Sequence, residues 1–482
     1  MSLKLYNTRT RGVEQFVPQS PQAVRIYVCG LTPSAQAHIG HARSFLFFDV
    51  LRRYLRHLGY AVTYVQNVTD IDDRSIARAK VTGEDWRQIV AGYYADFKTA
   101  MRTLDVAEPD HEPRATAFIP QIITMIEELI SREYAYISKD GVYYSVSKFA
   151  RYGDLSHRKI DELQSGARIE IDEYKRDPLD FALWKFAKPD EPAWPSPWGD
   201  GRPGWHIECS AMSRELISSR LDIHGGGADL IFPHHENEIA QSEPLMTSPP
   251  MANFWVHGGL LLSDRRKISK SLGNFEPLGD LLGRHDPQAI RLLFLQTGYS
   301  KVMNFTEESI VAAAASLEKL KAAWRSLLPP GGSEKRPENG VGLLTSIELV
   351  LDNDMNTAGA LAELHLFASK IDSLSESQRA AAFAEYSQAL HILGLEPKPH
   401  WRAQPDPELP ADFLNRLRNE IGDTLSLNGS TPKDAIELVI AQRARSRANK
   451  DFATSDRLRI ALQNSGVILN DSKEGTTWTV AD

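Results

Sequence analysis

The sequence is poor in cysteine, in long apolar runs and in excess positive charge, and each shortage narrows the kind of protein it encodes. Only two of its 482 residues are cysteine, Cys29 and Cys209, so no disulfide framework is expected and the cytoplasm is the expected compartment. No uninterrupted apolar stretch is long enough to cross a bilayer. The first residues, MSLKLYNTRTRGVEQF, lack the apolar segment of a secretory signal. We therefore expect no membrane partner.

Charge and size leave room for several functions. The net charge is −8, from 55 Lys and Arg against 63 Asp and Glu, which does not indicate a surface that is basic all over, yet allows a local basic patch. A hydrophobic share of 42% is ordinary for a globular enzyme. A chain of this length is expected to form several domains, and nothing in it demands more than a monomer.

The first part of the chain predicts a strand, a helix and a second strand. Residues 25–29 (RIYVC) and 62–68 (VTYVQNV) have the β-branched and aromatic composition of strands. Between them, residues 41–60 repeat apolar side chains at helical spacing, and Gly59 fits the end of a helix. This order predicts a βαβ unit with parallel strands, and hence an α/β, Rossmann-type fold.

The middle of the chain interrupts this pattern. Residues 80–135 are predicted to be mostly helical. The stretch up to about residue 205 is irregular, and it ends in PDEPAWPSPWGDGRPGW, which is too rich in Pro and Gly for a regular element. A helix (HIECSAMSRELI) and a strand (LDIHGGG) then follow. We therefore expect residues 116–204 to be an insertion that splits one nucleotide-binding fold.

Two segments rich in Pro, Gly and charge, 329–342 and 396–412, are typical of linkers between domains. Residues 343–395, between them, predict amphipathic helices, and residues 440–462 predict one strongly basic helix near the C-terminus. The basic helix can be a solvated face as well as a contact surface.

Four residues have the chemistry of a zinc site. Cys29 ends the first strand, Cys209 lies on a predicted helix, and His234 and Glu238 are at i and i+4, on one face if the segment is helical. Thiolate, imidazole and carboxylate are zinc ligands, usually four in number. Taken singly, each cysteine also fits a small core residue and the His–Glu pair also fits a surface pair, so spacing alone leaves both interpretations open.

Two further motifs indicate nucleotide binding. The turn His38-Ile39-Gly40-His41 precedes the first helix, whose N-terminal N–H groups suit phosphate, and Gly40 permits close approach. Lys267 and Lys270, in KISKS, could neutralise triphosphate oxygens. Either motif alone is more often a solvated surface feature. Together, in this order on a split fold, they resemble the signature of the class I aminoacyl-tRNA synthetases.

The resemblance extends to one family. The stretches RIYVCG, HIGHARSF, TYVQNVTDIDD, GRPGWHIECSAM, LDIHGGGADLIFPHHENEIAQSE, KISKSLGNF, LDNDMNTAGAL and NKDFATSDRLRIALQNSGVILNDSKEGTTW are similar to the cysteinyl-tRNA synthetases. The resemblance implies two steps: L-cysteine reacts with ATP to give cysteinyl-adenylate, and the terminal adenosine of tRNA(Cys) then takes the cysteinyl group. Mg²⁺ would accompany ATP. Nearly the whole chain is covered.

Residue roles follow from the resemblance. It implies one zinc ion per chain on Cys29, Cys209, His234 and Glu238, binding the substrate thiolate, which a soft metal prefers to the hydroxyl of serine. His38, His41 and Lys270 would bind ATP. The residues implied near the amino acid are Thr69, Trp205, His224 and Asp229, and those implied at the tRNA are Arg443, Arg445, Arg447, Lys450 and Trp478. Trp478 fits a core position equally well.

The implied architecture is a parallel-sheet catalytic domain, then a helical bundle, then a small anticodon-binding domain. Its predicted parts are 1–115 with 205–262 (two Rossmann-type halves), 116–204 (insertion), 263–310 (stem-contact region with the KISKS loop), 311–400 (helical bundle) and 401–482 (anticodon-binding domain).

The chain departs from the family pattern at three places. Pro33 and Ser34 stand where Val and Tyr are usual, which puts fine substrate contacts in doubt, and Ile268 replaces Met in the lysine motif. Arg74 and Ala77 replace lysines after TDIDD, so a persulfide-forming side activity linked to pyridoxal phosphate is not expected.

Two other functions stay open at this stage. The turn Thr32-Pro33 also fits the paralogous ligase that joins cysteine to an aminosugar in mycothiol synthesis, although that ligase lacks the C-terminal domain expected here. A non-catalytic RNA-binding paralogue is the other alternative. Such proteins typically lose the histidines of the HIGH turn or the second lysine of KISKS, and this chain keeps them.

Overall fold

The computed structural model describes residues 3–159, 174–217, 220–263, 266–267, 275–329, 340–402, 409, 412–425, 427, 431–472 and 475–480. The chain forms two compact units, Met1–Pro397 and Lys398–Asp482, which are treated separately below. Within the described ranges, no helix combines the length and apolarity needed to span a bilayer.

The centre of the first unit is a four-stranded parallel sheet in the order β10-β9-β3-β4, formed by β3 (Ala23–Leu31), β4 (Ala61–Val68), β9 (Leu221–Gly227) and β10 (Ala252–Gly258). The predicted α/β fold with a split parallel sheet is confirmed. The chain runs outward from β3 to β4 and later returns to the other side of β3 through β9. In open α/β sheets, ligands bind where the strand order reverses in this way, beyond the carboxyl ends of the strands.

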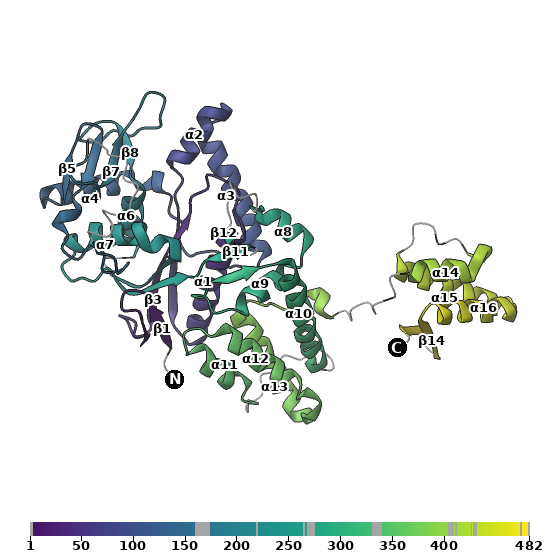
Figure 1. Cartoon of the computed structure of the whole chain (residues 1–482). Coiled ribbons are helices and arrows are strands. Elements are labelled where there is room, and N and C mark those ends of the chain that lie inside the picture. Colours follow the sequence, from purple (N-terminus) through teal and green to yellow (C-terminus); the bar gives the residue numbers. More distant parts are fainter. Residues whose placement is uncertain are drawn as a thin grey trace. The chain divides into compact units, whose positions relative to one another are not determined.

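Helix α1 (Ile39–His57) connects β3 to β4 and begins at the HIGH turn (Figure 1). His38 is its N-cap residue, and the helix ends just before Gly59, which has φ +90° and is the predicted terminator. The helix packs closely on β9, because a Cβ on Gly225 would lie 2.2 Å from Cζ of Phe48. The HGGG run is therefore the end of β9, and the strand predicted over LDIHGGG is confirmed.

The insertion forms its own antiparallel sheet, in the order β5-β6-β7-β8. Its strands are β5 (Ala135–Ile137), β6 (Gly141–Tyr144), β7 (Phe181–Phe186) and β8 (Gly201–Pro203). The prediction that PDEPAWPSPWGDGRPGW holds no regular element is wrong at β8. Proline is tolerated there because β8 is a short strand at the edge of the sheet. Helices α4 (Ile119–Ser131) and α6 (Trp205–Leu216) flank this sheet in sequence.

The rest of the first unit is mainly helical, and Figure 1 shows α11–α13 as a lobe separate from the insertion. The remaining helices are α2 (Asp73–Thr82), α3 (Trp86–Thr103), α7 (Glu236–Ser242), α8 (Leu278–Arg284), α9 (Pro287–Leu295), α10 (Glu307–Leu327), α11 (Leu343–Leu351), α12 (Thr357–Ala368) and α13 (Glu376–Leu393). A hairpin of β1 (Lys4–Asn7) and β2 (Gly12–Gln15) starts the unit, and a small sheet has the order β12-β11-β13, with β11 (Leu261–Ser263), β12 (Arg266–Lys267) and β13 (Met303–Phe305).

A buried charge network joins the helices of the first unit. The Asp49 carboxylate of α1 forms ion pairs with Arg52 and Arg53 of its own helix and with Arg291 of α9. Arg291 also donates a hydrogen bond to the Leu393 carbonyl at the end of α13. The side chains of Asp49 and Arg291 are both fully buried. The network therefore ties the helix that begins at the HIGH turn to the C-terminal helices of the unit.

The second unit contains α14 (Phe413–Ile421), α15 (Pro432–Ala448), α16 (Phe452–Asn464) and a hairpin of β14 (Val467–Ser472) and β15 (Gly475–Val480). The predicted single basic helix over 440–462 is wrong, because α15 ends before Asn449 and α16 begins at Phe452. Lys450 has φ +62°, and the Asp451 side chain accepts a hydrogen bond from the Thr454 N–H as the cap of α16. The finer domain boundaries given above stay predictions.

Candidate active site and metal centre

A cavity of about 580 Å³ opens at the carboxyl ends of β3, β9 and β10. One wall is the HIGH turn, and another is the segment Gly258–Leu262, which runs from β10 into β11. Cys29 and Trp205 line it from the side of the predicted metal site. The structure therefore brings Cys29, one of the predicted metal ligands, and the HIGH turn to one cavity, at the point where the strand order reverses.

The four predicted zinc ligands lie together, although they come from three separate elements. Cys29 is on β3, Cys209 on α6, and His234 and Glu238 on the helical segment that follows β9; one ligand atom from each lies within 4.8 Å of all the others, and all four residues are buried. The Cys29 and Cys209 sulfurs are 3.7 Å apart, and Glu238 Oε1 is 3.2 Å from Cys29 Sγ and 3.1 Å from His234 Nε2.

This donor set fits zinc. Two sulfurs that are each about 2.3 Å from a tetrahedral zinc ion would lie about 3.8 Å apart, close to the observed separation. His234 points Nε2 toward Glu238, while its Nδ1 lies 2.9 Å from Nδ1 of His206. An outer partner on the second ring nitrogen is the usual arrangement for a metal-binding histidine.

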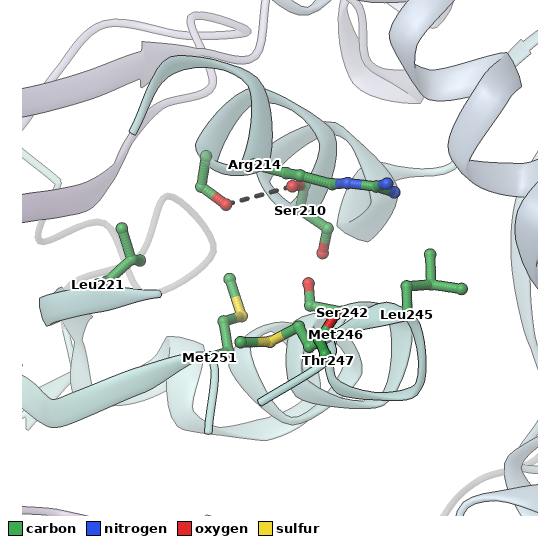
Figure 2. Close-up of a pocket in the computed structure, with 9 residues that line it drawn as sticks. Ser210, Arg214, Leu221, Ser242, Leu245, Met246, Thr247 and Met251 are labelled. Atoms are coloured by element: carbon green, nitrogen blue, oxygen red, sulfur yellow. Dashed lines mark hydrogen bonds between the residues drawn. The ribbon is translucent and has the colours of Figure 1, made fainter. Parts of the chain in front are cut away.

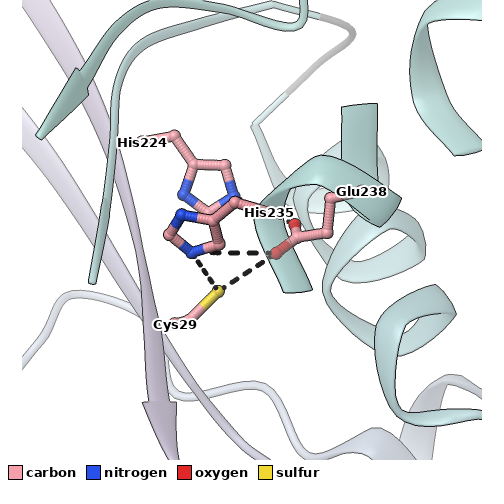
Figure 3. A group of neighbouring side chains, drawn as sticks. All are labelled: Cys29, His224, His235 and Glu238. Carbon is pink, nitrogen blue, oxygen red and sulfur yellow. Dashed lines mark hydrogen bonds and ion pairs between the residues drawn. The ribbon is translucent and has the colours of Figure 1, made fainter. Parts of the chain in front are cut away.

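A second quartet shares two of these residues. Cys29, His224, His235 and Glu238 also lie within 4.8 Å of one another (Figure 3). His235 Nε2 is 3.3 Å from Cys29 Sγ, and its Nδ1 is 2.8 Å from Nε2 of His257. The sequence interpretation missed His235 and His257. The signal was available for His235, because it lies three residues before Glu238 and so shares its helical face.

The cluster concentrates negative charge on Glu238. Burial alone would raise the pKa of the Glu238 carboxyl, but His224 and His234 hold that pKa well below its ordinary value. Both ring nitrogens of His224 lie within hydrogen-bonding distance of oxygen atoms, Nδ1 at 3.1 Å from the Tyr27 carbonyl and Nε2 at 2.9 Å from Glu238 Oε2. Burial raises the pKa of the Cys29 thiol, the neighbouring Cys209 and Glu238 adding to the rise. A cation at the centre would relieve these charges.

The two histidines of the HIGH turn present hydrogen-bond donors to the cavity. His38 Nδ1 accepts from the Gly40 N–H at 3.0 Å, and His41 Nδ1 accepts from the His38 N–H at 3.1 Å. Burial, together with the charges of His38 and Arg74, lowers the pKa of His41 to about 3, and burial lowers the pKa of His38 as well. Both imidazoles are therefore neutral near pH 7, and the proton of each is on Nε2, where it can meet a phosphate oxygen.

The residues predicted near the amino acid divide into two groups. Trp205 and Asp229 line the cavity, and the Trp205 ring stacks on the His234 ring at a centroid distance of 4.5 Å. Thr69 and His224 are almost completely buried behind it and do not line it. A change at Trp205 therefore acts on the cavity directly, whereas Thr69 acts through its neighbours.

Two of the residues that differ from the family pattern line the cavity. Ser34 and Arg74 both line it, and the Ser34 carbonyl accepts a hydrogen bond from Arg78 at 3.2 Å. Of the predicted ATP-binding lysines, Lys267 is the last residue of β12, with its side chain outside the described parts, and Lys270 lies wholly outside the described residues.

The predicted tRNA-binding residues differ in exposure. Arg445, Arg447 and Lys450 are exposed on the second unit. Arg443 is buried, and its guanidinium makes two bonds to the Asp471 carboxylate, of 2.8 and 2.6 Å. Trp478 packs against the core of this unit and donates to Glu437 at 3.3 Å. Arg443 and Trp478 are thus each bound to a side chain within the second unit, Asp471 and Glu437 respectively.

A separate cavity of about 220 Å³ lies near the opposite ends of β9 and β10 (Figure 2). Its lining includes Leu221, the first residue of β9, and Met251, which precedes β10, with hydroxyl groups from Ser210 and Ser242. None of the predicted site residues lines it. It shares two helices with the metal site: Ser210 follows Cys209 on α6, and Ser242 lies on α7, which carries Glu238.

Comparison with known proteins agrees with this geometry. Residues 15–315 match the family described as tRNA synthetases class I (C) catalytic domain. The solved Mycobacterium tuberculosis methionyl-tRNA synthetase in complex with methionyl-adenylate shares the fold, with a TM-score of 0.55, 16% identity and coverage of 77% of this chain and 89% of that one. The parallel sheet, the HIGH turn and the cavity between them are those of a class I aminoacyl-tRNA synthetase, an enzyme of the ligase type.

Full-length relatives narrow the assignment. The cysteine--tRNA ligase of Alkalilimnicola ehrlichii is 44% identical over 477 residues, and that of Halorhodospira halophila is 45% identical over 483 residues, each match covering 99% of both chains. This chain belongs to the cysteine--tRNA ligase family. The resemblance stated from the motifs is confirmed.

Proposed function

We propose that this protein activates L-cysteine with ATP and transfers it to the 3′-terminal adenosine of tRNA(Cys), selecting cysteine with a zinc ion held by Cys29, Cys209, His234 and Glu238. The observation that carries this proposal is that one cavity is lined both by the HIGH turn and by Cys29 of the four-ligand cluster. When bound, zinc supplies a soft Lewis acid that favours a thiolate over the hydroxyl of serine. This accounts for discrimination that a packed pocket alone supplies poorly.

The protein's own residues then orient ATP. The Nε2–H groups of His38 and His41 donate to phosphate oxygens, and the positive end of the α1 dipole adds to this anion site. Neutral imidazoles can donate without a change of protonation during the reaction. The cysteine carboxylate attacks the α-phosphorus and pyrophosphate leaves, so orientation and stabilisation of charge carry the step with no protein nucleophile.

Trp205 and Asp229 are proposed to surround the amino acid. The Trp205 ring covers His234 and forms part of the cavity wall, which places apolar surface beside the metal site. Asp229 is an exposed carboxylate on the same cavity and suits the substrate ammonium group. Thr69 and His224 support this pocket from behind. Lys267 and Lys270 are proposed to meet the triphosphate together with Mg²⁺.

The second unit is proposed to read the anticodon region of the tRNA. Arg445, Arg447 and Lys450 are exposed there and can contact phosphates, which position an RNA without reading its sequence. Arg443 is left out of the proposed contacts because Asp471 already binds its guanidinium.

Cysteine-dependent exchange of pyrophosphate into ATP tests the proposal. We expect exchange with cysteine, loss of exchange after zinc chelation with restoration by added zinc, and little exchange with serine. Comparable exchange with serine would contradict selection by the metal, and no exchange at all would favour the non-catalytic alternative. Charging of tRNA(Cys) separates the synthetase from the aminosugar ligase, which would transfer cysteine to an aminosugar and leave tRNA uncharged.

A further inference from the structure

One buried arginine, next to residues of α1 that line the cavity, has no role in the chemistry described so far. Arg43 lies on α1, two residues after His41, and its exposed fraction is 5%. Its guanidinium donates to five main-chain carbonyls, those of Gly259, Leu260, Gly298, Tyr299 and Lys301, at 3.0, 2.9, 3.3, 3.5 and 2.5 Å. All five acceptors are main-chain carbonyl oxygens, so these hydrogen bonds hold the backbone at the five residues in place.

The five carbonyls belong to two loops that α1 does not otherwise bind through main-chain hydrogen bonds. Gly259 and Leu260 connect β10 to β11, and residues 298–301 connect α9 to β13. The two loops also bind each other, because the Gly259 N–H donates to the Tyr299 carbonyl at 2.7 Å and the Met303 N–H donates to the Leu260 carbonyl at 3.0 Å. Arg43 thus joins three segments that are distant in sequence.

This junction forms one side of the ATP cavity. Gly258–Leu262 lines the cavity together with the HIGH turn, which lies at the start of the helix that carries Arg43. The β10–β11 loop and the α9–β13 loop lie so close together that a Cβ on Gly259 would be 2.3 Å from the Lys301 carbonyl oxygen. β11 then pairs with β12, whose last residue, Lys267, begins the KISKS motif.

We propose that Arg43 is a positioning residue that sets the position of the Gly258–Leu262 wall of the ATP cavity relative to the HIGH turn. The proposal rests on the function proposed above. A planar guanidinium with hydrogens on both terminal nitrogens can bind carbonyls on two loops at once, whereas an ammonium group has three donors at one point. Burial lowers the pKa of Arg43 to about 10, so the group stays charged near pH 7. The charge strengthens its bonds to the carbonyl dipoles.

The test uses two independent changes, each with a matched control. Arg43→Lys keeps the charge and removes the planar fork; Arg56→Lys, on the same helix and exposed, is its control. Gly259→Ala pushes the loops apart without touching Arg43; its control is Gly283→Ala in α8, where a Cβ meets nothing within 4 Å. Each variant is measured as the full chain at saturating zinc.

Active sites are counted from the burst of adenylate formation, so that unfolded molecules do not enter the rate. We expect pyrophosphate exchange per active site to fall about 10²-fold in Arg43→Lys and Gly259→Ala, the cost of misplacing reacting groups by about 1 Å. KM for cysteine should stay within about twofold, and both controls should match the wild type. A purely stabilising role would lower the number of active sites and leave the rate per site unchanged.

Each outcome decides the proposal. Rates per site within about twofold of the wild type in either folded variant overturn it, and so does failure of both variants to fold at low temperature, because Arg43 would then be a structural residue. A wild type without cysteine-dependent exchange would instead refute the proposed function. In that case, unchanged ATP affinity of Arg43→Lys in calorimetric titration would overturn the positioning role separately.

Discussion

Replacing Asp49 with asparagine should destabilise the first unit by about 3–5 kcal/mol. The carboxylate is fully buried and lies 2.5 Å from Arg291 Nη2, 2.8 Å from Arg52 Nη2 and 2.9 Å from Arg53 Nε. Arg291 is as deeply buried as Asp49, and Arg52 is only 1% exposed. Asn keeps the shape and removes the charge, so two buried guanidinium groups lose their counter-ion. Loss of one partner from a buried ion pair costs this much because the remaining charge is uncompensated.

Urea unfolding of the full chain, followed by tryptophan fluorescence, measures the loss. With an m value of about 3 kcal/mol/M, the midpoint of the first unit should fall by about 1–1.7 M. Arg56→Gln is the control on the same helix. It breaks the exposed ion pair with Asp110, in which the two side chains are 42% and 38% exposed, so its cost should stay below about 1 kcal/mol.

The pH dependence supplies a second check. Burial alone would raise the pKa of Asp49, but Arg291, Arg53 and Arg52 hold it well below its ordinary value. The carboxylate therefore adds stability above the ordinary carboxyl pKa, near 4, and that stability is lost as the pH falls toward the lower pKa of the folded state. The difference between wild type and Asp49→Asn should be full at pH 7 and should shrink below about pH 4.

A double-mutant cycle isolates the pair. If the ion pair is the cause, Asp49→Asn combined with Arg291→Met should cost clearly less than the sum of the two single changes. Additive costs, or a midpoint shift in Asp49→Asn no larger than that of Arg56→Gln, would refute the reasoning.

Three further predictions concern the two sites. Because the pKa of His41 is about 3 and that of His38 is lowered, kcat/KM for ATP should show no break near pH 6.5, and a break there would mean that a histidine of the HIGH turn titrates. His235→Asn should retain about one zinc per chain by elemental analysis and Cys209→Ser should lose it; the reverse pattern would assign the ion to the second quartet. Arg443→Gln should destabilise the second unit by roughly 1–3 kcal/mol, the range for a hydrogen bond to a charged group, whereas Arg445→Gln should lower tRNA charging without changing the melting temperature; equal melting of both would contradict the structural role of Arg443.

The central fold could be predicted from the sequence because the patterns that indicate its strands and helix are local. Apolar spacing in residues 41–60 and the β-branched segments on either side predicted β3, α1 and β4 to within three residues at each end. The strand over LDIHGGG was predicted too, but the sequence does not show why Gly225 has to be glycine, because the cause is distant: Phe48 of α1 needs the space that a Cβ would fill. The break at Lys450 was missed because the basic composition continues through it, although Asp451 carries the chemistry of a helix cap.

The site was predictable in its chemistry and less so in its geometry. Ligand types and the family resemblance selected Cys29, Cys209, His234 and Glu238, and the structure places them together. Only the fold shows that His235 reaches Cys29 from the other side. Arg43 carried no signal at all, because its five acceptors are main-chain carbonyls, and a sequence does not reveal where a distant backbone passes.

The origin of the cluster's ligands sets an order of events during synthesis. Cys29 and Glu238 are 209 positions apart, so at roughly 5–20 residues per second a ribosome needs about 10–40 s to supply the last ligand after the first. For the first 180 residues of that interval the Cys29 thiol lacks Cys209 as well as Glu238, and the strand that carries Cys29 also lacks its neighbour β9. The emerging chain thus passes through a stage with one unpartnered sulfur, and we expect thiol-modifying reagents to label nascent chains at Cys29 until the second half of the sheet has been made.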